Sequence, residues 1–319
     1  MELTVAALAL AAGFFLLARG ADALVEGGAT LARRWGVSNW VVGLTVVAWG
    51  TSVPEIVVSA LASAEGRPGY ALGNIVGSNI ANIGLVLGAT GLVLPRVLAG
   101  RIGWIDAAMV LAGIGGLWYA LSDRYLSRLE AGGLLGVFCL YTVSIFRRTH
   151  VTSDDPGAPQ AQRPWLAVLF GCIAIIGGAR AVLYGAYEVA AIFELTDGIV
   201  GLLLLAVGTS LPELAAGISS ARKGHAEIGL GNVVGSNLFN TFAVSGIAGL
   251  VRPFGDGGAA DSVWTRDSGY ALEIDLPVNL AASVVLLALP WLGQGRLKAL
   301  ALLLGYIAFA VSLAGRVSS

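Results

Sequence analysis

Two glutamates, Glu55 and Glu213, stand 158 residues apart inside long apolar segments of this chain. A carboxylate at the middle of a membrane costs about 2.5–3.5 kcal/mol on insertion scales, so such a residue is rare unless it faces a cavity, pairs or binds an ion. For one glutamate, the competing explanation is a protonated carboxyl group hydrogen-bonded between helices. Two glutamates at equivalent positions, each directly after a helix-breaking proline, favour a cation site instead.

Each glutamate ends a duplicated motif, Gly-Thr-Ser-x-Pro-Glu, which occupies residues 50–55 and 208–213. The proline removes a backbone donor and interrupts the helix, and unpaired backbone at membrane depth is tolerated only where it lines a cavity. We therefore expect the break to leave carbonyl oxygens available, such as those of Ala48 and Ala206. The same motif adds hydroxyl oxygens at the two breaks, from Thr51, Ser52, Thr209 and Ser210.

A second duplicated motif, Gly-Asn-x-Val-Gly-Ser-Asn, follows at residues 73–79 and 231–237, again 158 residues apart. Its glycines are four residues apart, so their main role is close helix packing. Polar residues at positions i, i+4 and i+8 share one face of a helix and would be costly against lipid. We expect these two stripes to face the centre of the molecule: Asn74, Ser78 and Asn82, and Asn232, Ser236 and Asn240.

The side chains collected by these motifs offer only oxygen ligands. Cys139 and Cys172 lie in apolar runs, and His150 and His225 fall in loops where we expect them to be solvated. Carboxylate, amide, hydroxyl and carbonyl oxygens suit hard cations such as Ca²⁺ and Na⁺, whereas transition metals favour His or Cys. Two carboxylates can neutralise one divalent ion or two monovalent ions, which is a simple physical basis for exchange.

The composition predicts an all-α integral membrane protein. Hydrophobic residues make up 56% of the 319 residues, charged residues only 12%, and the mean hydropathy is +0.81. A soluble domain has about 25% charged residues, so most of the chain is expected in the lipid bilayer. The net charge of −1 argues against a nucleic-acid partner. Apolar windows predict ten spans, at about 3–25, 38–64, 70–94, 104–121, 126–146, 165–189, 197–221, 226–250, 275–292 and 297–315.

A polar linker at 147–163 divides the chain into halves of five predicted spans, 1–146 and 164–319. Because five is odd, the second half enters the membrane from the opposite side, and the repeats are inverted. The motifs place a break in helices 2 and 7. Inverted repeats with discontinuous helices carry their binding sites near the membrane midplane, at the repeat interface.

Loop charges predict the orientation, since Lys and Arg concentrate on the cytoplasmic side. Eleven Lys and Arg residues lie on loops 1–2, 3–4, 5–6, 7–8 and 9–10, and six lie on the loops and terminus of the other side. The linker is therefore expected in the cytoplasm and both termini outside, in the cell (inner) membrane. The eleven are Arg33, Arg34, Arg96, Arg101, Arg147, Arg148, Arg163, Arg222, Lys223, Arg296 and Lys298.

The two motifs, each present twice within ten predicted spans, resemble the α-repeats of the sodium/calcium exchanger family, within the wider cation/Ca²⁺ antiporter superfamily. The resemblance covers both halves of the chain. Because the linker at 147–163 is too short for a large cytoplasmic regulatory domain, the chain is similar to prokaryotic members.

The resemblance implies a set of ion ligands. Glu55 and Glu213 correspond to the central Ca²⁺ ligands, and Asn82 and Asn240 occupy the remaining central positions. Some family members carry Asp at the second of these, so Asn240 removes a possible charge and proton site and bears on the ion stoichiometry. The further Na⁺ or Ca²⁺ ligands implied are Thr51, Ser52, Ser78, Thr209, Ser210, Ser236 and the carbonyls of Ala48 and Ala206.

Polarity and symmetry together favour alternating access. Spans 2, 3, 7 and 8 carry every duplicated oxygen, while spans 1 and 6 are rich in Leu, Ala and Gly and could slide without exposing unsatisfied polar groups. Inverted repeats make the two end states near mirror images. The sequence therefore predicts an antiporter that exchanges Ca²⁺ for Na⁺, binds both as transported substrates, has no cofactor and is not an enzyme.

Other functions remain open alternatives on these residues. The carboxylates could carry protons as readily as Na⁺, which would give an H⁺-coupled antiporter of Ca²⁺ or another cation. A cation channel would use the same oxygens. An intramembrane hydrolase using Ser and Glu is a remote alternative, because no span holds a His or Lys beside a Ser. The sequence assigns no oligomeric state.

Overall fold

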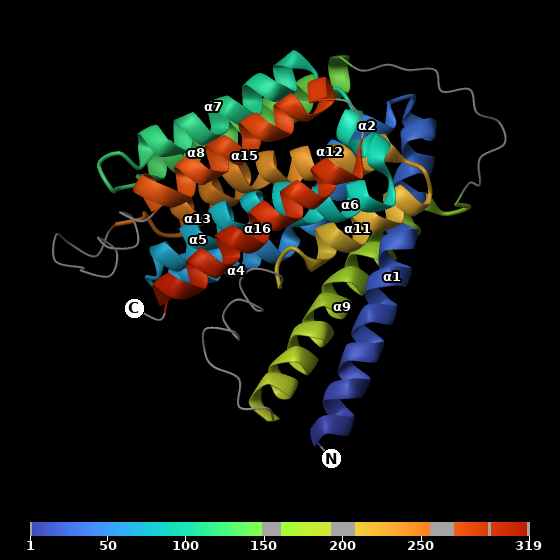
Figure 1. The fold of residues 1–319 in the computed structure, drawn as a ribbon. Coiled ribbons are helices and arrows are strands. Elements are labelled where there is room, and N and C mark those ends of the chain that lie inside the picture. The colour runs from blue at the N-terminus through green and yellow to red at the C-terminus, as the bar shows by residue number, and fades with distance from the viewer. Residues whose placement is uncertain (1, 149–160, 193–207, 256–270, 293–294, 318–319) are drawn as a thin grey trace.

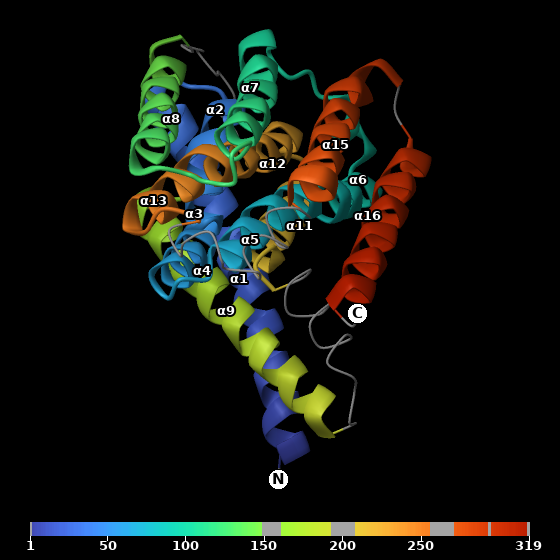
Figure 2. The same ribbon diagram turned by 90° about the vertical axis from the view of Figure 1, so that its left-hand side faces the viewer.

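The computed structural model describes residues 2–148, 161–192, 208–255, 271–292 and 295–317, and these are nearly all helical. Two long helices, α1 (Glu2–Trp35) and α9 (Pro164–Ile192), lie side by side and project from the remaining helices (Figure 1). In Figure 2, α5 and α11 lie in the middle of the molecule, between α4 and α13 on one side and α15 and α16 on the other.

The first repeat continues from α1 through a broken second span and a third span that changes helix type. After these come the η3 turn (Pro95–Ala99), α7 (Trp104–Ala120) and α8 (Arg128–Arg148). The second span comprises α2 (Asn39–Val42), the π-helical η1 (Gly43–Val47), α3 (Ala48–Thr51) and α4 (Val53–Ala64), and the third comprises α5 (Pro68–Ala81), the π-helical η2 (Asn82–Val86) and α6 (Leu87–Val93).

The second repeat reproduces these elements at the same offset. The bounds of α11 (Leu211–Arg222) and α13 (Ser245–Val251) are those of α4 and α6 shifted by 158 residues. Between them lie α12 (Ala226–Leu238) and the π-helical η4 (Phe239–Val244). The chain then forms η5 (Ala271–Asp275), α15 (Leu276–Ala288), η6 (Leu289–Leu292) and α16 (Arg296–Val317). The duplication seen in the sequence is therefore a duplication of structure.

The all-α membrane architecture is confirmed. Seven helices in the described part of the chain are long and apolar enough to cross a membrane, or eight if the bent pair Asn39–Thr51 and Val53–Ala64 is one span. The predicted span at 104–121 appears as α7, a shorter apolar helix. The predicted span at 197–221 lies partly outside the described residues, so the count of ten stays a prediction.

The predicted break in helix 2 is present, with a bend of 48° between its two parts. Ser52 stands at the break with φ −90° and ψ 9°, and Ser210, its equivalent before α11, has φ −89° and ψ 2°. Each is followed by a proline in the first helical turn, a position where its missing amide hydrogen costs nothing. The helix in each repeat is thus broken at an equivalent serine, with nearly the same backbone dihedral angles.

One expectation about the break is wrong. The break does not free the Ala48 carbonyl from its helical partner, because this carbonyl accepts a hydrogen bond from the amide of Ser52 at 3.0 Å. In an α-helix a proline cannot donate a hydrogen bond to the carbonyl four residues before it. For Pro54 that carbonyl is the one of Gly50. The corresponding backbone at Ala206 lies outside the described residues.

The long helices α1 and α9 pack backbone against backbone through two ladders of glycines seven residues apart. A Cβ placed on Gly20 would lie 2.9 Å from the carbonyl oxygen of Gly171, and one on Gly178 would lie 2.8 Å from that of Gly13. Only glycine permits so close an approach. The ladders correspond by the 158-residue offset: Gly13, Gly20 and Gly27 on α1, and Gly171, Gly178 and Gly185 on α9.

Candidate cation-binding site

The two glutamates occupy equivalent places in the fold. Glu55 lies in the first turn of α4 and Glu213 in the first turn of α11, directly after the two breaks, and both residues are 0% exposed. The N-terminal end of a helix carries partial positive charge, which favours a carboxylate there. The two side chains also interact electrostatically with each other across the site. The fold therefore brings two carboxyl groups to one buried place.

Residues of the first break contact the second repeat. The Ser52 hydroxyl lies 3.1 Å from Oε1 of Glu213 and 3.1 Å from the hydroxyl of Ser236. Thr51 Oγ1 lies 3.3 Å from Oδ1 of Asn232 on α12. The break in one repeat is thus held against the glutamate and the polar stripe of the other.

The converse contact joins the second break to the first repeat, since the hydroxyls of Ser78 on α5 and Thr209 lie 3.1 Å apart. Ser210, beside Thr209, is buried. Together with the contacts of Ser52, this pairing places the two breaks and both polar stripes around one centre. The predicted site residues that take part in these hydrogen bonds are Ala48, Thr51, Ser52, Ser78, Thr209, Glu213 and Ser236.

Several buried oxygens of this region accept no hydrogen bond within the described structure. They are both carboxylate oxygens of Glu55, Oε2 of Glu213, and the side-chain oxygens of Asn82 and Asn240. A buried polar atom without a partner costs about 1–3 kcal/mol, so an unpaired group calls for an explanation. A group of unpaired acceptors, with the carboxylates ionised, is suited to a hard cation, which takes oxygen ligands only.

Asn82 and Asn240 both lie where an α-helix becomes π-helical, at the start of η2 and of η4. π-Helical turns are rare and frequently occur at functional sites. The sequence analysis selected both residues but did not predict the change of helix type around them.

Two further asparagines, which the sequence analysis did not select, form contacts between the repeats beside these residues. Asn79 and Asn237 are the last residues of the second motif, and both are buried. Asn237 Oδ1 accepts a hydrogen bond from Asn82 Nδ2 at 3.1 Å, and Asn79 Nδ2 donates to Thr241 at 2.8 Å. Their signal in the sequence is the duplication itself, since both are polar and repeat at the same offset.

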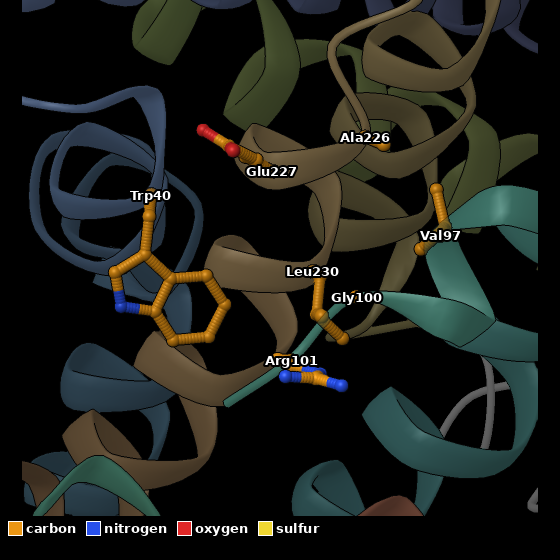
Figure 3. A pocket seen from close by; sticks show the side chains of 7 residues that line it. All are labelled: Trp40, Val97, Gly100, Arg101, Ala226, Glu227 and Leu230. Atoms are coloured by element: carbon orange, nitrogen blue, oxygen red, sulfur yellow. The ribbon is translucent and has the colours of Figure 1, made fainter. Parts of the chain in front are cut away.

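A small cavity of about 130 Å³ lies elsewhere, between the start of α2, the η3 turn and the start of α12. In Figure 3 Trp40 and Leu230 face each other across it, with Arg101 below. None of the predicted ligands lines this cavity. The candidate site therefore lies apart from this cavity.

Comparison with known proteins gives consistent relatives over nearly the whole chain. The sodium/calcium exchanger protein family matches residues 5–147 and 163–314. The chain is 36% identical over 306 residues to the putative antiporter CaxA of Alkalimonas amylolytica, covering 92% of each protein. It is 32% identical to the sodium/calcium exchanger MaX1 of Methanosarcina acetivorans, covering 98% of this chain and 99% of MaX1.

A solved structure of the sodium-calcium exchanger NCX_Mj superposes with a TM-score of 0.78 at 28% identity, covering 97% of this chain and 98% of that one. The match extends over both repeats, as does the family match. Proteins of this family are transporters and not enzymes. The chain therefore belongs to the sodium/calcium exchanger family and is a cation/Ca²⁺ antiporter.

Proposed function

We propose that this antiporter exchanges Ca²⁺ for Na⁺ at a midplane site between the two broken helices. The observation that carries the proposal is the group of buried oxygens without donors, contributed by Glu55, Glu213, Asn82 and Asn240. Ca²⁺ accepts six to eight oxygen ligands in flexible geometry, and two carboxylates match its charge. Without a cation, two buried carboxylates would repel each other, so the site favours exchange over being left empty.

The hydroxyls around this group complete the proposed ligand set. Thr51, Ser52, Ser78, Thr209, Ser210 and Ser236 supply neutral oxygens suited to Na⁺ or Ca²⁺. The Ala48 and Ala206 carbonyls keep their proposed role as ligands. The Ala48 oxygen already accepts a hydrogen bond from the Ser52 amide, so it would bind an ion through its second lone pair.

The names of the relatives support Na⁺ as the coupling ion. MaX1 is called a sodium/calcium exchanger, and the NCX_Mj structure was obtained after soaking in Na⁺ and Sr²⁺. Proton coupling is the second candidate, because an unpaired buried carboxylate accepts a proton as well as a cation. The neutral Asn240, where some family members carry Asp, leaves Glu55 and Glu213 as the acidic residues of this proposed site.

The deciding experiment is uptake of ⁴⁵Ca²⁺ into proteoliposomes under an imposed gradient. An outward Na⁺ gradient should drive uptake, while an equal K⁺ gradient should not. A pH gradient at equal Na⁺ on both sides serves as the third arm. Uptake driven by the pH gradient but not by Na⁺ would replace the proposal with proton coupling, and unitary currents in a planar bilayer would indicate a channel.

We propose the orientation predicted from the loop charges, with the linker in the cytoplasm. Contacts between loops assigned to the same side support the relative topology. Arg96 donates to the carbonyl of Gly224 at 2.7 Å, joining loops 3–4 and 7–8, and Leu126 pairs with Phe254, joining loops 4–5 and 8–9. A membrane-impermeant thiol reagent should reach Asp123→Cys only from outside and Lys223→Cys only from the cytoplasm.

We further propose alternating access in which α1 and α9 move against a core formed by the second, third, seventh and eighth spans. The glycine ladders support motion of the two long helices as one body, since their backbones are in direct contact. Cross-linking α1 to the core through paired cysteines should stop exchange. Unimpaired exchange with the link closed in most molecules would contradict this mechanism.

A further inference from the structure

The side-chain amide of Asn237 is held in one orientation by a backbone carbonyl. Its Nδ2 donates to the carbonyl oxygen of Asn79 at 3.4 Å. A carbonyl oxygen can only accept, so the nitrogen of the Asn237 amide must face it. The other end of the same amide is then its oxygen, which accepts a hydrogen bond from Nδ2 of Asn82, at the start of η2, at 3.1 Å.

This second hydrogen bond fixes the Asn82 amide in turn. Because its nitrogen is engaged by Asn237, its oxygen is the free end, and this Oδ1 is buried without a partner in the described structure. A cation binds the oxygen of an amide and is repelled by its NH₂ group. A chain of two hydrogen bonds thus starts at a backbone carbonyl and ends with an acceptor at residue 82.

The equivalent chain is absent from the described part of the other half. By the 158-residue offset, Asn79 should hold Asn240 as Asn237 holds Asn82. Asn79 instead donates to the hydroxyl of Thr241 at 2.8 Å, and both the oxygen and the nitrogen of the Asn240 side chain lack partners. The position equivalent to Thr241 is Ile83, which cannot accept such a bond.

We propose that Asn237 is a positioning residue that holds the Asn82 carbonyl oxygen toward the transported cation, while the Asn240 amide is free to turn. The inference rests on the proposed function, since it deepens the role of Asn82 in the same site. One half of the site presents a fixed amide oxygen, and the other presents an amide that can offer either end.

The test compares Asn237→Ala with Asn79→Ala, a matched control at the equivalent position. Each removes one buried inter-repeat amide, and Asn79→Ala keeps the backbone carbonyl to which Asn237 donates. Loss of a residue that orients a metal ligand typically weakens affinity 10- to 100-fold, so we expect Asn237→Ala to raise the KM for Ca²⁺ about tenfold with kcat little changed. Asn79→Ala should leave KM near the wild-type value, whatever its effect on thermal stability.

A rescue experiment separates orientation from packing. Both oxygens of a carboxylate can face an ion, so Asn82→Asp needs no partner to orient it. Adding Asn237→Ala to Asn82→Asp should therefore leave the KM for Ca²⁺ unchanged, as should adding it to Asn82→Ala. Ca²⁺ binding to purified protein, followed by thermal shift, gives a readout independent of transport. Asn237→Ser is measured in parallel, with the same shift expected, in case the alanine variant does not fold.

The outcomes separate this inference from the proposed function. If Asn82→Ala weakens Ca²⁺ binding but Asn237→Ala and Asn237→Ser do not, the positioning role is overturned and the site stands. An equal rise in KM from Asn79→Ala, or an additive effect in the Asn82→Ala background, overturns it in the same way. If Asn82→Ala itself leaves Ca²⁺ binding unchanged, the role of Asn82 in the site fails, and the inference fails with it.

Discussion

The two repeats share one backbone but differ in how their broken helices are covered. Val53 and Leu61 on α4 are 39% and 57% exposed, whereas their equivalents on α11, Leu211 and Ser219, are 7% and 4% exposed. The difference arises because α1 packs along α11 and no comparable packing of α9 covers α4 in the described structure. The repeats therefore differ in that a long helix covers α11, here called the closed side, and leaves α4 uncovered.

On the closed side, polar contacts join the long helix α1 to α11 and the residue after it. Asp22 on α1 accepts a hydrogen bond from Ser219 at 2.7 Å, and Glu26 forms an ion pair with Lys223 at 3.5 Å. The positions equivalent to the first pair are Arg180 and Leu61, which cannot form it. With the predicted orientation, the closed side is the cytoplasmic one. In the proposed alternating-access mechanism, these contacts would favour the state in which this side is closed.

The largest effect is expected where the repeats are most alike. Glu55→Gln and Glu213→Gln should each reduce Ca²⁺ transport roughly 100-fold or more, because removing one partner of a buried charge contact costs about 2–5 kcal/mol and about 1.4 kcal/mol is tenfold. The measurement is ⁴⁵Ca²⁺ flux in proteoliposomes with protein yield verified. Glu65→Gln, at the exposed end of α4, is the control and should transport normally. Substantial flux in either site variant would contradict the assignment.

A second large effect is expected at the glycine ladder that joins the repeats. Gly178→Ala would place a methyl group 2.8 Å from the Gly13 carbonyl, so α1 and α9 must separate. Overpacking of this kind costs about 1–3 kcal/mol. We expect a lower melting temperature and slower exchange. The adjacent Gly177 has open space around it, so Gly177→Ala is the matched control. Similar losses in both variants would show that the ladder does not hold the pair.

A smaller effect is expected from removing the contact that distinguishes the closed side. Ser219→Ala breaks the hydrogen bond to Asp22, and bonds to charged groups contribute about 1.5–3 kcal/mol. We expect a population shift of roughly tenfold toward the state in which α11 is uncovered. A cysteine at Leu211 should then react faster with an impermeant thiol reagent, and one at Val53 more slowly, in a background without Cys139 and Cys172.

The control for this shift comes from the other repeat. Leu61→Ala removes a side chain at the position equivalent to Ser219 but breaks no polar contact with α1. It should leave both labelling rates unchanged. Equal rates in Ser219→Ala and wild type would mean that packing alone, without the polar contact, closes this side.

The sequence predicted the parts of the fold that a duplicated pattern determines. Apolar windows at 70–94 and 226–250 match the helical runs from Pro68 to Val93 and from Ala226 to Val251 within a few residues. The break beside Pro54 followed from the missing donor of proline. The duplication also indicated which polar residues face inward, because their spacing puts them on one helix face.

Features that depend on contacts between repeats could not be predicted in the same way. The engagement of the Ala48 carbonyl depends on how Ser52 turns at the break, and π-helical turns have no pattern of their own. The role proposed for Asn237 rests on a difference between the repeats, Thr241 against Ile83, whose consequence is visible only when α5 and η4 are side by side. The glycines of each ladder recur every seven residues in the sequence, but the sequence does not indicate which helix they pack against.

The smallest expected effect concerns the loop between α11 and α12, where His225 lies. The sequence analysis expected a solvated histidine, but the side chain is half-buried. Burial first, and then the positive charges of Arg33 and Lys223, lower the pKa of His225 below its ordinary value of 6.5. The equivalent residue in the first repeat is Arg67, which stays charged throughout.

The lowered pKa of His225 makes the stability of the folded protein depend on pH in a definite direction. Because the fold disfavours the charged imidazole, the unfolded chain binds more protons at acidic pH, so this contribution to stability is present above the ordinary pKa and is lost as pH falls below about 6.5. His225→Gln cannot be protonated, so its melting temperature should fall less than that of the wild type between about pH 8 and pH 5. His150→Gln controls for loss of a histidine as such and should follow the wild type. Parallel profiles for wild type and His225→Gln would show that this loop does not titrate with folding, and that the repeats differ in stability only through the helices.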